Sequence, residues 1–383
     1  MTARTARSFD EIEPLLEAWR SLRWSRIETD PEFFRTVVES RPEVLSPHVT
    51  LVERDGRPAA MGVGRLEEVP LEFRLGYKTL AAPRLRAITL VNGGISENAD
   101  ETAQAALLDE LLACLRRGEA DVLQLPKLAA GSPMQELARR KARRGTRRPF
   151  AARTVHWRVA VPSSLEEFFA ARSWNTRRNL RKHVRRFERE HEGRFSVVAF
   201  EGRQNASQLL HDMVELNAKS YKHGLGVGFL DDEEHRRLVD LGAGRHIFRA
   251  RVLYVDGAPA SFWCGFKFGR GFFSWLTAYD PELARYSVGT YVLVDLLEEL
   301  CADPEVEFVD WGFGDADYKR SLGDESWLED DVVLFAARLK TLALNGLLSV
   351  FLGLDFAARR VLGDSQLVRR VKRRWRHRLS GGG

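Results

Sequence analysis

The stretch FRARVLYVDGAPASFWCGFKFGRGFFSWLTAY, residues 248–279, decides the fold class. Two apolar runs flank Asp256-Gly257, a dipeptide typical of two-residue hairpin turns. A helix is expected over 290–301, where apolar residues recur at helical spacing, and a strand over 306–311. Hairpin, strand, helix and strand in this order predict a mixed α/β unit with a mostly antiparallel sheet flanked by helices.

The same order of elements occurs earlier in the chain. The stretch HVTLVERDGRPAAMGVGRLE, residues 48–67, turns at Asp55-Gly56, 201 residues before the second hairpin turn. A helix over 103–117 and a strand over 121–125 follow it. Coincidence between common hairpins is the alternative, but the shared order favours a tandem duplication.

A length of 383 residues accommodates two such copies. We expect a degenerate N-terminal copy over 1–161, beginning with an amphipathic helix over 9–22. The second copy is expected over 162–335, and a helical, basic tail over 336–383.

The formal net charge of +5 conceals a strong asymmetry. Residues 139–153, 172–189 and 369–378 together contribute a net charge of +22, and the rest of the chain contributes −17. Such clusters indicate an anionic partner, for example a nucleotide, a phosphorylated substrate, nucleic acid or anionic lipid. Solvated helix faces are the alternative for each cluster.

Several classes of protein and site are excluded or disfavoured. Cys114, Cys264 and Cys301 lack metal-ligand spacing and are typical of core residues in a reducing compartment. The start of the chain has no signal-peptide core, and the longest apolar stretch, 341–354, is shorter than the roughly 20 residues of a spanning helix. We therefore expect a cytoplasmic protein without a metal. Motifs of serine hydrolases, P-loop enzymes, zinc proteases and Rossmann dehydrogenases are absent from the sequence.

Three stretches carry candidate chemistry. RYSVGT, residues 285–290, opens a helix after a strand; Gly289 would admit a phosphate to the free N–H groups and positive dipole of the helix start. DWGFGDADYKR, residues 310–320, follows a strand, and SWNTRRNLRK, residues 173–182, places cations at a helix start. The structural alternatives are a helix cap at Ser287, a tight turn capped by Asp315, and a solvated basic helix.

The three stretches resemble motifs of one protein group. SWNTRRNLRKHVRRFERE (173–190) is similar to the S-x-x-T-R-x-N-[LI]-[RK]-[KR] segment of FemAB-like and CelD-like proteins. YDPELARYSVGTYVLVDLLEE (279–299) resembles their Y-D-P…Y-S-P-G loop and helix, and DWGFGDADYKRSLGD (310–324) their D-[FL]-G-x-G-x-x-x-Y-K signature. The sequence departs from these motifs at Val288, where proline is usual, and at Trp311, where Phe or Leu is usual. Over 162–324 the chain is thus similar to GNAT-superfamily acyltransferases with a BioF-type acetyltransferase domain.

The resemblance implies a tandem GNAT-like fold and an N-acyltransferase. Such an enzyme moves an acyl group from acyl-CoA, with acetyl-CoA the expected donor, to an amine of a small molecule, sugar or cell-envelope precursor by direct attack. The residues it implies fall into three sets. The catalytic candidates are Lys319, Tyr318, Asp310, Asp315 and Asp317. The cofactor-binding candidates are Arg285, Tyr286, Ser287, Val288, Gly289 and Thr290. The substrate-binding candidates are Arg177, Arg178 and Trp311.

Two other functions stay open at this point. One is an aminoacyl-tRNA-dependent, peptidoglycan-type aminoacyl transferase, although no aromatic-rich RNA-binding motif is evident. The other is a non-catalytic, membrane-recruited protein of an exopolysaccharide assembly system. In that case the apolar run 342–354 and RRVKRRWRHR (369–378) would contact anionic lipid on the inner face of the membrane. A final helix packed on the domain is the alternative for this tail.

Overall fold

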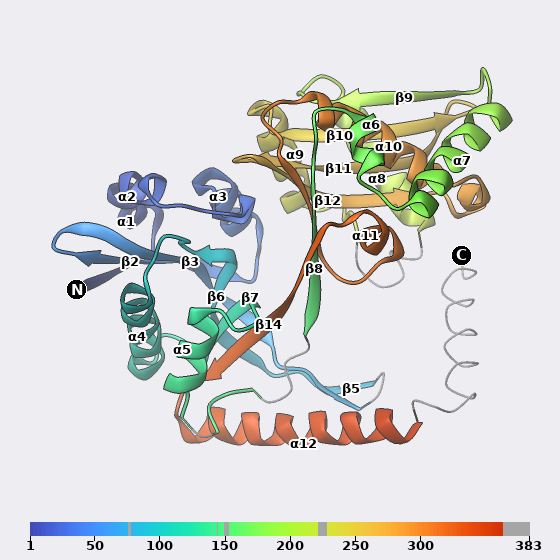
Figure 1. Cartoon of the computed structure of the whole chain (residues 1–383). Coiled ribbons are helices and arrows are strands. Elements are labelled where there is room, and N and C mark those ends of the chain that lie inside the picture. The colour runs from blue at the N-terminus through green and yellow to red at the C-terminus, as the bar shows by residue number, and fades with distance from the viewer. Residues whose placement is uncertain (76–77, 144, 149–152, 221–227, 363–383) are drawn as a thin grey trace. The chain divides into compact units, whose positions relative to one another are not determined.

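The computed structural model describes residues 1–75, 78–143, 145–148, 153–220 and 228–362. The chain forms two compact units (Figure 1). Unit 1 comprises Met1–Thr154 and the described part of a segment that begins at Trp327; unit 2 comprises Val155–Ser326. The C-terminal cluster 369–378 lies outside the described residues.

Each unit contains one of the two predicted hairpins. Asp55 and Gly56 have φ of 52° and 72°, and Asp256 and Gly257 have φ of 50° and 80°. Positive φ at both central residues is the geometry of a type I′ turn, which matches the twist of the flanking strands. The local dipeptide therefore sets both hairpins.

Unit 1 is a mixed sheet with strand order β1-β2-β3-β6-β7-β14 and helices around it. Its strands are β1 (Thr2–Ala6), β2 (Val44–Arg54), β3 (Arg57–Pro70), β6 (Arg84–Ile95), β7 (Val122–Ala129) and β14 (Glu325–Phe335), with a separate pair β4 (Phe73–Leu75) and β5 (Lys78–Ala81). Its helices are α1 (Phe9–Ile12), α2 (Leu16–Ser21), α3 (Pro31–Ser40), α4 (Glu101–Arg117), α5 (Pro133–Lys141) and α12 (Leu339–Leu362).

Unit 2 has the strand order β8-β13-β12-β11-β10-β9. Its strands are β8 (Thr154–Ala160), β9 (Phe195–Phe200), β10 (Phe248–Val255), β11 (Ala258–Phe268), β12 (Gly271–Tyr279) and β13 (Phe308–Phe313). Its helices are α6 (Leu165–Ala170), α7 (Trp174–Glu190), α8 (Ala206–Lys219), α9 (Glu233–Gly244), α10 (Val288–Ala302) and α11 (Asp317–Leu322). The expected fold class, tandem α/β copies with mostly antiparallel sheets, is confirmed.

Two neighbouring parallel strands part in unit 2. The β12–β13 pairing covers only Gly271↔Phe308 to Phe273↔Asp310, although β12 continues to Tyr279. A register shift against β11 occurs beside this point, at Gly265, where a Cβ would lie 2.2 Å from the Phe273 carbonyl oxygen. Only glycine allows this close approach. The bulge and the parting leave one edge of β12 without a β13 partner.

Unit 1 repeats this geometry. The β6–β7 pairing also covers three residue pairs, and the β3–β6 register shifts next to Gly64. A Cβ on Gly64 would lie 2.7 Å from the Thr89 carbonyl oxygen. Gly64 precedes Gly265 by the same 201 residues that separate the hairpins, so the duplication extends to the bulge.

The last strand of each copy pairs outside the segment expected for it. β8 ends the first copy, yet it pairs antiparallel with β13 of unit 2. β14 ends the second copy, yet it pairs antiparallel with β7 of unit 1. Residues 155–161 therefore lie in unit 2 and residues 327–335 in unit 1. The domain boundaries expected from the sequence were after residues 161 and 335.

Two expected helices have a more detailed structure. The helix expected over 9–22 divides at Pro14 into α1, a 3-10 turn and α2, because proline cannot donate an intrahelical hydrogen bond. The apolar run that begins α12 packs one face on unit 1 through buried Leu348, together with Leu344 and Phe351. Within the described chain, no helix is both long and apolar enough to cross a membrane.

Candidate functional site

The start of α10 has the features of an anion-binding loop. β12 leads through a 3-10 turn, Pro281–Tyr286, to Ser287, which has φ of 60° and precedes the helix without capping it through its side chain. The N–H groups of the first helical residues, Val288 and Gly289, have no intrahelical acceptor. A Cβ on Gly289 would meet nothing closer than 3.7 Å, so the loop is open there. Free N–H groups and the helix dipole favour a phosphate at this point.

The other residues of the loop hold its shape. The Val288 side chain is fully buried in the core of unit 2, so it offers only its backbone to a ligand. The Tyr286 ring packs edge-on against His191 and beneath the Arg285 guanidinium, 4.6 Å from its centroid. Thr290 donates its backbone N–H to the Ser287 carbonyl at 2.9 Å.

His183 joins α7 to this loop. Its Nδ1 and the Ser287 hydroxyl are hydrogen bonded at 2.8 Å. Burial, together with the charges of Lys182 and Arg186, lowers the pKa of His183, which favours the neutral ring at pH 7. His183 was not among the residues predicted from the sequence. A signal was present, because His183 lies three residues after Leu180 and four before Phe187, beside the buried stripe of α7.

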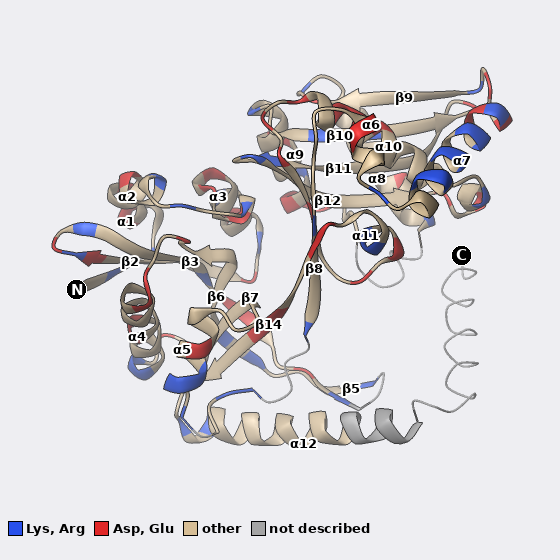
Figure 2. Cartoon of the chain, in the orientation of Figure 1, with Lys and Arg blue, Asp and Glu red and all other residues tan. Residues whose placement is uncertain are grey.

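The exposed face of α7 is strongly basic (Figure 2). Ser173 caps the helix, which places Arg177 and Arg178 in its first two turns, and Arg178 lies over the exposed Trp174 ring. Acids neutralise part of this face, for example Glu166 at 2.8 Å from Arg181. Among the described residues, Arg177 has no ion-pair partner. This face therefore keeps positive charge available beside the loop.

The cluster at 139–153 is different. Four of its described cations are paired within unit 1: Arg139 and Arg153 with Asp330 at 3.6 and 3.2 Å, Arg140 with Glu101 at 2.5 Å, and Lys141 with Asp109 at 2.5 Å. These pairs favour a structural and solvated role for the first basic cluster.

Asp310 is a buried anchor at the end of β13. Its Oδ1 is hydrogen bonded to Nε2 of His156 and accepts the Gly312 backbone N–H, both at 2.8 Å. Asp310 and His156 are 2% and 1% exposed. The carboxylate therefore holds the turn at Gly312, whose φ is 70°, and lies away from solvent.

Lys319 holds the same loop from the other side. Its Nζ donates to the carbonyl oxygens of Gly312 at 3.3 Å and of Phe313 at 2.8 Å. The side chain is largely buried. An ammonium group shared between two carbonyls ties the end of β13 to α11.

Three aromatic rings pack together next to Lys319. Tyr318 lies edge-on to Trp263 and Trp311, with centroids at 5.3 and 5.8 Å. Trp263 donates its indole N–H to the Ser274 hydroxyl at 3.0 Å. The buried indole nitrogen of Trp311 has no hydrogen-bond partner among the described residues.

Asp315 and Asp317 occupy the exposed part of the loop. Asp315 forms an ion pair with Arg320 at 2.5 Å, and Asp317 also contacts Arg320. Ala316, and not Asp315, precedes α11, so the capping turn considered for Asp315 is not formed.

β11 relates the two motif loops to each other. The Ser261 hydroxyl would lie 3.9 Å from a Cβ on Gly289, and Trp263 packs on Tyr318 and Trp311. Ser261 and Trp263 are two residues apart in one strand and point to the same face. The open helix start and the aromatic loop therefore border one region of unit 2, beside the parting of β12 and β13.

In the first copy, β6 and β7 separate as β12 and β13 do, but the start of the following helix, α4, is capped by a side chain. A cavity of about 270 Å³ lies there, with Leu90, Gly94 and Leu125 in its wall. At the start of α4, however, the Asp100 side chain accepts the Ala103 N–H at 2.8 Å. A carboxylate at this position repels phosphate, so the start of α4 lacks the open anion-binding geometry described for α10.

Comparison with known proteins is consistent with this geometry. Residues 174–320 match the family model described as "Acetyltransferase (GNAT) domain". Comparison with curated proteins finds no match to this sequence.

Three solved structures are similar in fold. FemX has a TM-score of 0.57 at 10% identity, over 88% of this chain and 97% of that chain. The C-terminal domain of a putative lysylphosphatidylglycerol synthetase from Agrobacterium fabrum has a TM-score of 0.51 at 10% identity, over 92% and 96%. A protein of unknown function from Bacteroides thetaiotaomicron has a TM-score of 0.51 at 11% identity, over 84% and 97%. Residues 174–320 therefore match a GNAT acetyltransferase domain, and the chain is similar in fold to FemX.

Proposed function

We propose that unit 2 transfers an acyl group from acyl-CoA, with acetyl-CoA the expected donor, to an amine of a small molecule, sugar or cell-envelope precursor. The observation that carries this proposal is the uncapped, glycine-bearing start of α10 at the end of β12. The N–H groups of Val288 and Gly289 would bind the CoA pyrophosphate. Arg285 and the basic face of α7, with Arg177 and Arg178, would bind further phosphate oxygens.

The chemistry would take place where β12 leaves β13. Beyond Phe273, backbone N–H groups on that edge of β12 are not used in pairing with β13. One of them would donate to the thioester carbonyl oxygen as negative charge develops on it. A new C–N bond then forms, the C–S bond breaks, and the thiolate of CoA leaves.

Two protons have to be managed. We assign Tyr318 as the donor to the leaving sulfur, because its ring lies between Trp263 and Trp311 beside the parting. Asp315 and Asp317 are the exposed acids that can take the proton of the attacking amine. Asp310, which is buried and hydrogen bonded through Oδ1 to His156 and Gly312, is assigned a positioning role.

The test is a charge substitution at the helix start. Gly289→Asp adds a carboxylate where phosphate would bind, whereas Gly289→Ala adds the same Cβ without the charge. Neither Cβ meets a contact closer than 3.7 Å, so both variants should fold. We expect Gly289→Asp to weaken acetyl-CoA binding at least about tenfold by calorimetry, a loss of roughly 1.4 kcal/mol, and Gly289→Ala to change it much less. Equal affinities for the two variants would remove α10 from donor binding.

Aminoacyl-tRNA is a second candidate donor, favoured by the exposed basic face of α7. A tRNA would cover more of that face than CoA can reach, including Arg185 and Arg189 near its C-terminal end. Replacing both by Glu would then abolish turnover with aminoacyl-tRNA. The same pair of substitutions would leave turnover with acetyl-CoA nearly unchanged.

We also propose peripheral contact with an anionic membrane through α12 and the sequence after it. Leu339, Leu347, Val350 and Leu354 recur on one side of α12 and are 48–88% exposed. RRVKRRWRHR follows α12 in the sequence. Co-sedimentation with anionic vesicles should be lost on deletion of 363–383, a cut that spares Leu348 in the core. Unchanged co-sedimentation would refute the contact, and absence of acyl transfer with either donor would favour the non-catalytic alternative.

A further inference from the structure

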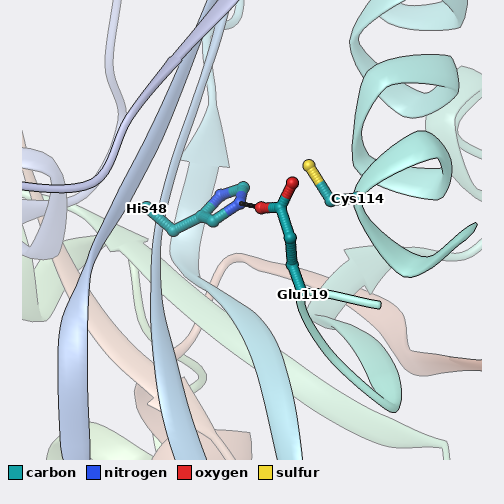
Figure 3. Close-up of side chains that lie close together, drawn as sticks. All are labelled: His48, Cys114 and Glu119. Atoms are coloured by element: carbon teal, nitrogen blue, oxygen red, sulfur yellow. Dashed lines mark ion pairs between the residues drawn. The ribbon is translucent and has the colours of Figure 1, made fainter. Parts of the chain in front are cut away.

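A histidine, a cysteine and a glutamate meet inside unit 1 (Figure 3). His48 comes from β2, Cys114 from the last turn of α4, and Glu119 from the segment after α4. The ligand atoms of the three side chains lie within 4.8 Å of one another. Nε2 of His48 lies 3.8 Å from Oε2 of Glu119.

The backbone fixes two of these residues relative to each other. Gly118 ends α4 with φ of 92° and donates its N–H to the Cys114 and Leu115 carbonyls. The Glu119 N–H also donates to the Cys114 carbonyl, at 3.1 Å. This αL cap turns the chain so that the Glu119 side chain returns beside the Cys114 sulfur.

His48 is the unexplained member of the group. It is 1% exposed, and neither ring nitrogen has a hydrogen-bond partner among the described residues. A buried imidazole ordinarily has at least one such partner. Burial, followed by the nearby charge of Arg7, lowers its pKa to about 4, so the ring is neutral at pH 7 with a lone pair available.

We propose that His48, Cys114 and Glu119 bind one Zn²⁺ ion. A neutral imidazole, a thiolate and a carboxylate are the N, S and O ligands that Zn²⁺ takes in tetrahedral sites. Ligand atoms in such a site are about 3.5 Å apart, so the distances between the three ligand atoms need to shorten by about 1.3 Å at most. A fourth ligand is at hand, because Oε1 of Glu110 lies 3.9 Å from the Cys114 sulfur.

Two arginines, Arg7 and Arg117, contact the group. Arg7 donates to Oε2 of Glu119 at 2.8 Å, and Arg117 donates to Oε1 at 2.9 Å. Arg117 also approaches the Cys114 sulfur at 3.1 Å, where a guanidinium stabilises a thiolate. Both side chains are about half exposed, so they can shift as the metal binds.

Binding moves one proton. Burial raises the pKa of Cys114 to about 11, so the residue is a thiol before the metal binds. A Zn–S bond forms, the S–H bond breaks, and the proton goes to the buffer. With Glu110, Glu119, Arg7 and Arg117 charged throughout, the formal charge of the cluster changes from zero to +1.

The experiment uses the full chain and Zn²⁺ or Co²⁺ as the probe. After chelator treatment, addition of Zn²⁺ and desalting, we expect the natural protein to retain about one Zn²⁺ per chain by elemental analysis. Co²⁺ should give a sulfur-to-metal charge-transfer band. Both signals should be lost in Cys114→Ser and strongly reduced in His48→Asn and Glu119→Gln.

A matched control is available in the other copy. Cys301 is also buried, near the C-terminal end of α10, the helix that corresponds to α4. Cys301→Ser should retain Zn²⁺ and the Co²⁺ band in full, and circular dichroism should show all variants folded. Failure of the folded natural protein to retain Zn²⁺, or equal retention by Cys114→Ser, would overturn the proposal. Neither result bears on acyl transfer by unit 2.

Discussion

Replacing Lys319 by methionine should loosen the loop that joins β13 to α11. Methionine keeps most of the apolar stem but removes the ammonium that donates to the Gly312 and Phe313 carbonyls. Hydrogen bonds from a charged donor stabilise by roughly 1.5–3 kcal/mol, so we expect the loop to lose about 2.5 kcal/mol of local stability. That loss corresponds to a population of the open state about 70-fold larger, and therefore to amide exchange about 70-fold faster.

Hydrogen exchange by mass spectrometry measures this opening. The informative amides are those of Gly314, which donates to the Val155 carbonyl, and Gly323, which donates to the Lys319 carbonyl, each at 2.8 Å. Lys340→Met makes the same substitution at an exposed site and should leave these amides unchanged. Turnover should fall in Lys319→Met as the loop loosens. Exchange within twofold of the natural protein would refute the reasoning, and turnover lost at unchanged exchange would assign Lys319 to the chemistry itself.

Three further predictions concern stability. Gly265→Ala should lower the Tm by several degrees or prevent folding, because its Cβ would lie 2.2 Å from a backbone carbonyl; Gly289→Ala, which meets only ordinary contacts, should leave the Tm nearly unchanged. Arg172→Met should lower the free energy of unfolding in urea by about 3 kcal/mol, because buried Arg172 forms an ion pair with the Asp324 carboxylate. The double variant Arg172→Met, Asp324→Asn should be only slightly less stable than the single variant, because the pair is already broken. In the metal-free protein, burial of the neutral His48 ring contributes its full share of the free energy of unfolding above pH 6.5, and this share falls by up to about 3 kcal/mol as the pH falls to about 4. His48→Asn should therefore flatten the dependence of the free energy of unfolding on pH between 6.5 and 4. An unchanged slope in this range would contradict the lowered pKa of His48.

Local features of this fold could be predicted from the sequence. Asp-Gly turns and helix periodicity act over a few residues, so the two hairpins and the helices expected over 103–117 and 290–301 were predictable to within a few positions. The stretches 285–290 and 310–320 follow β12 and β13 of the same sheet, and their roles in donor binding and catalysis stay predictions.

Long-range partners could not be predicted in this way. Nothing near Asp310 in the sequence indicates His156, and nothing near Cys114 indicates His48, because strand order brings these residues together. The role of Lys319 was also hidden, since a buried and an exposed lysine look alike in a motif. Because Lys319 donates to two carbonyls of the β13–α11 loop, the open question is whether it affects acyl transfer directly or by holding this loop in place.

The exchange of β8 and β14 has a consequence for biosynthesis. Ala129 of β7 pairs with Glu329 of β14, 200 residues later in the chain. During translation, one edge of β7 therefore stays unpaired until the ribosome has synthesised β14. Contacts of such sequence separation slow folding, and the waiting edge is a site for pairing with other chains. We therefore expect an N- or C-terminal half expressed alone to fold poorly, because each half lacks one strand of its sheet. Insertions near 154 and 326, where the chain passes between the units, should lower the yield more than insertions at the Asp-Gly turns.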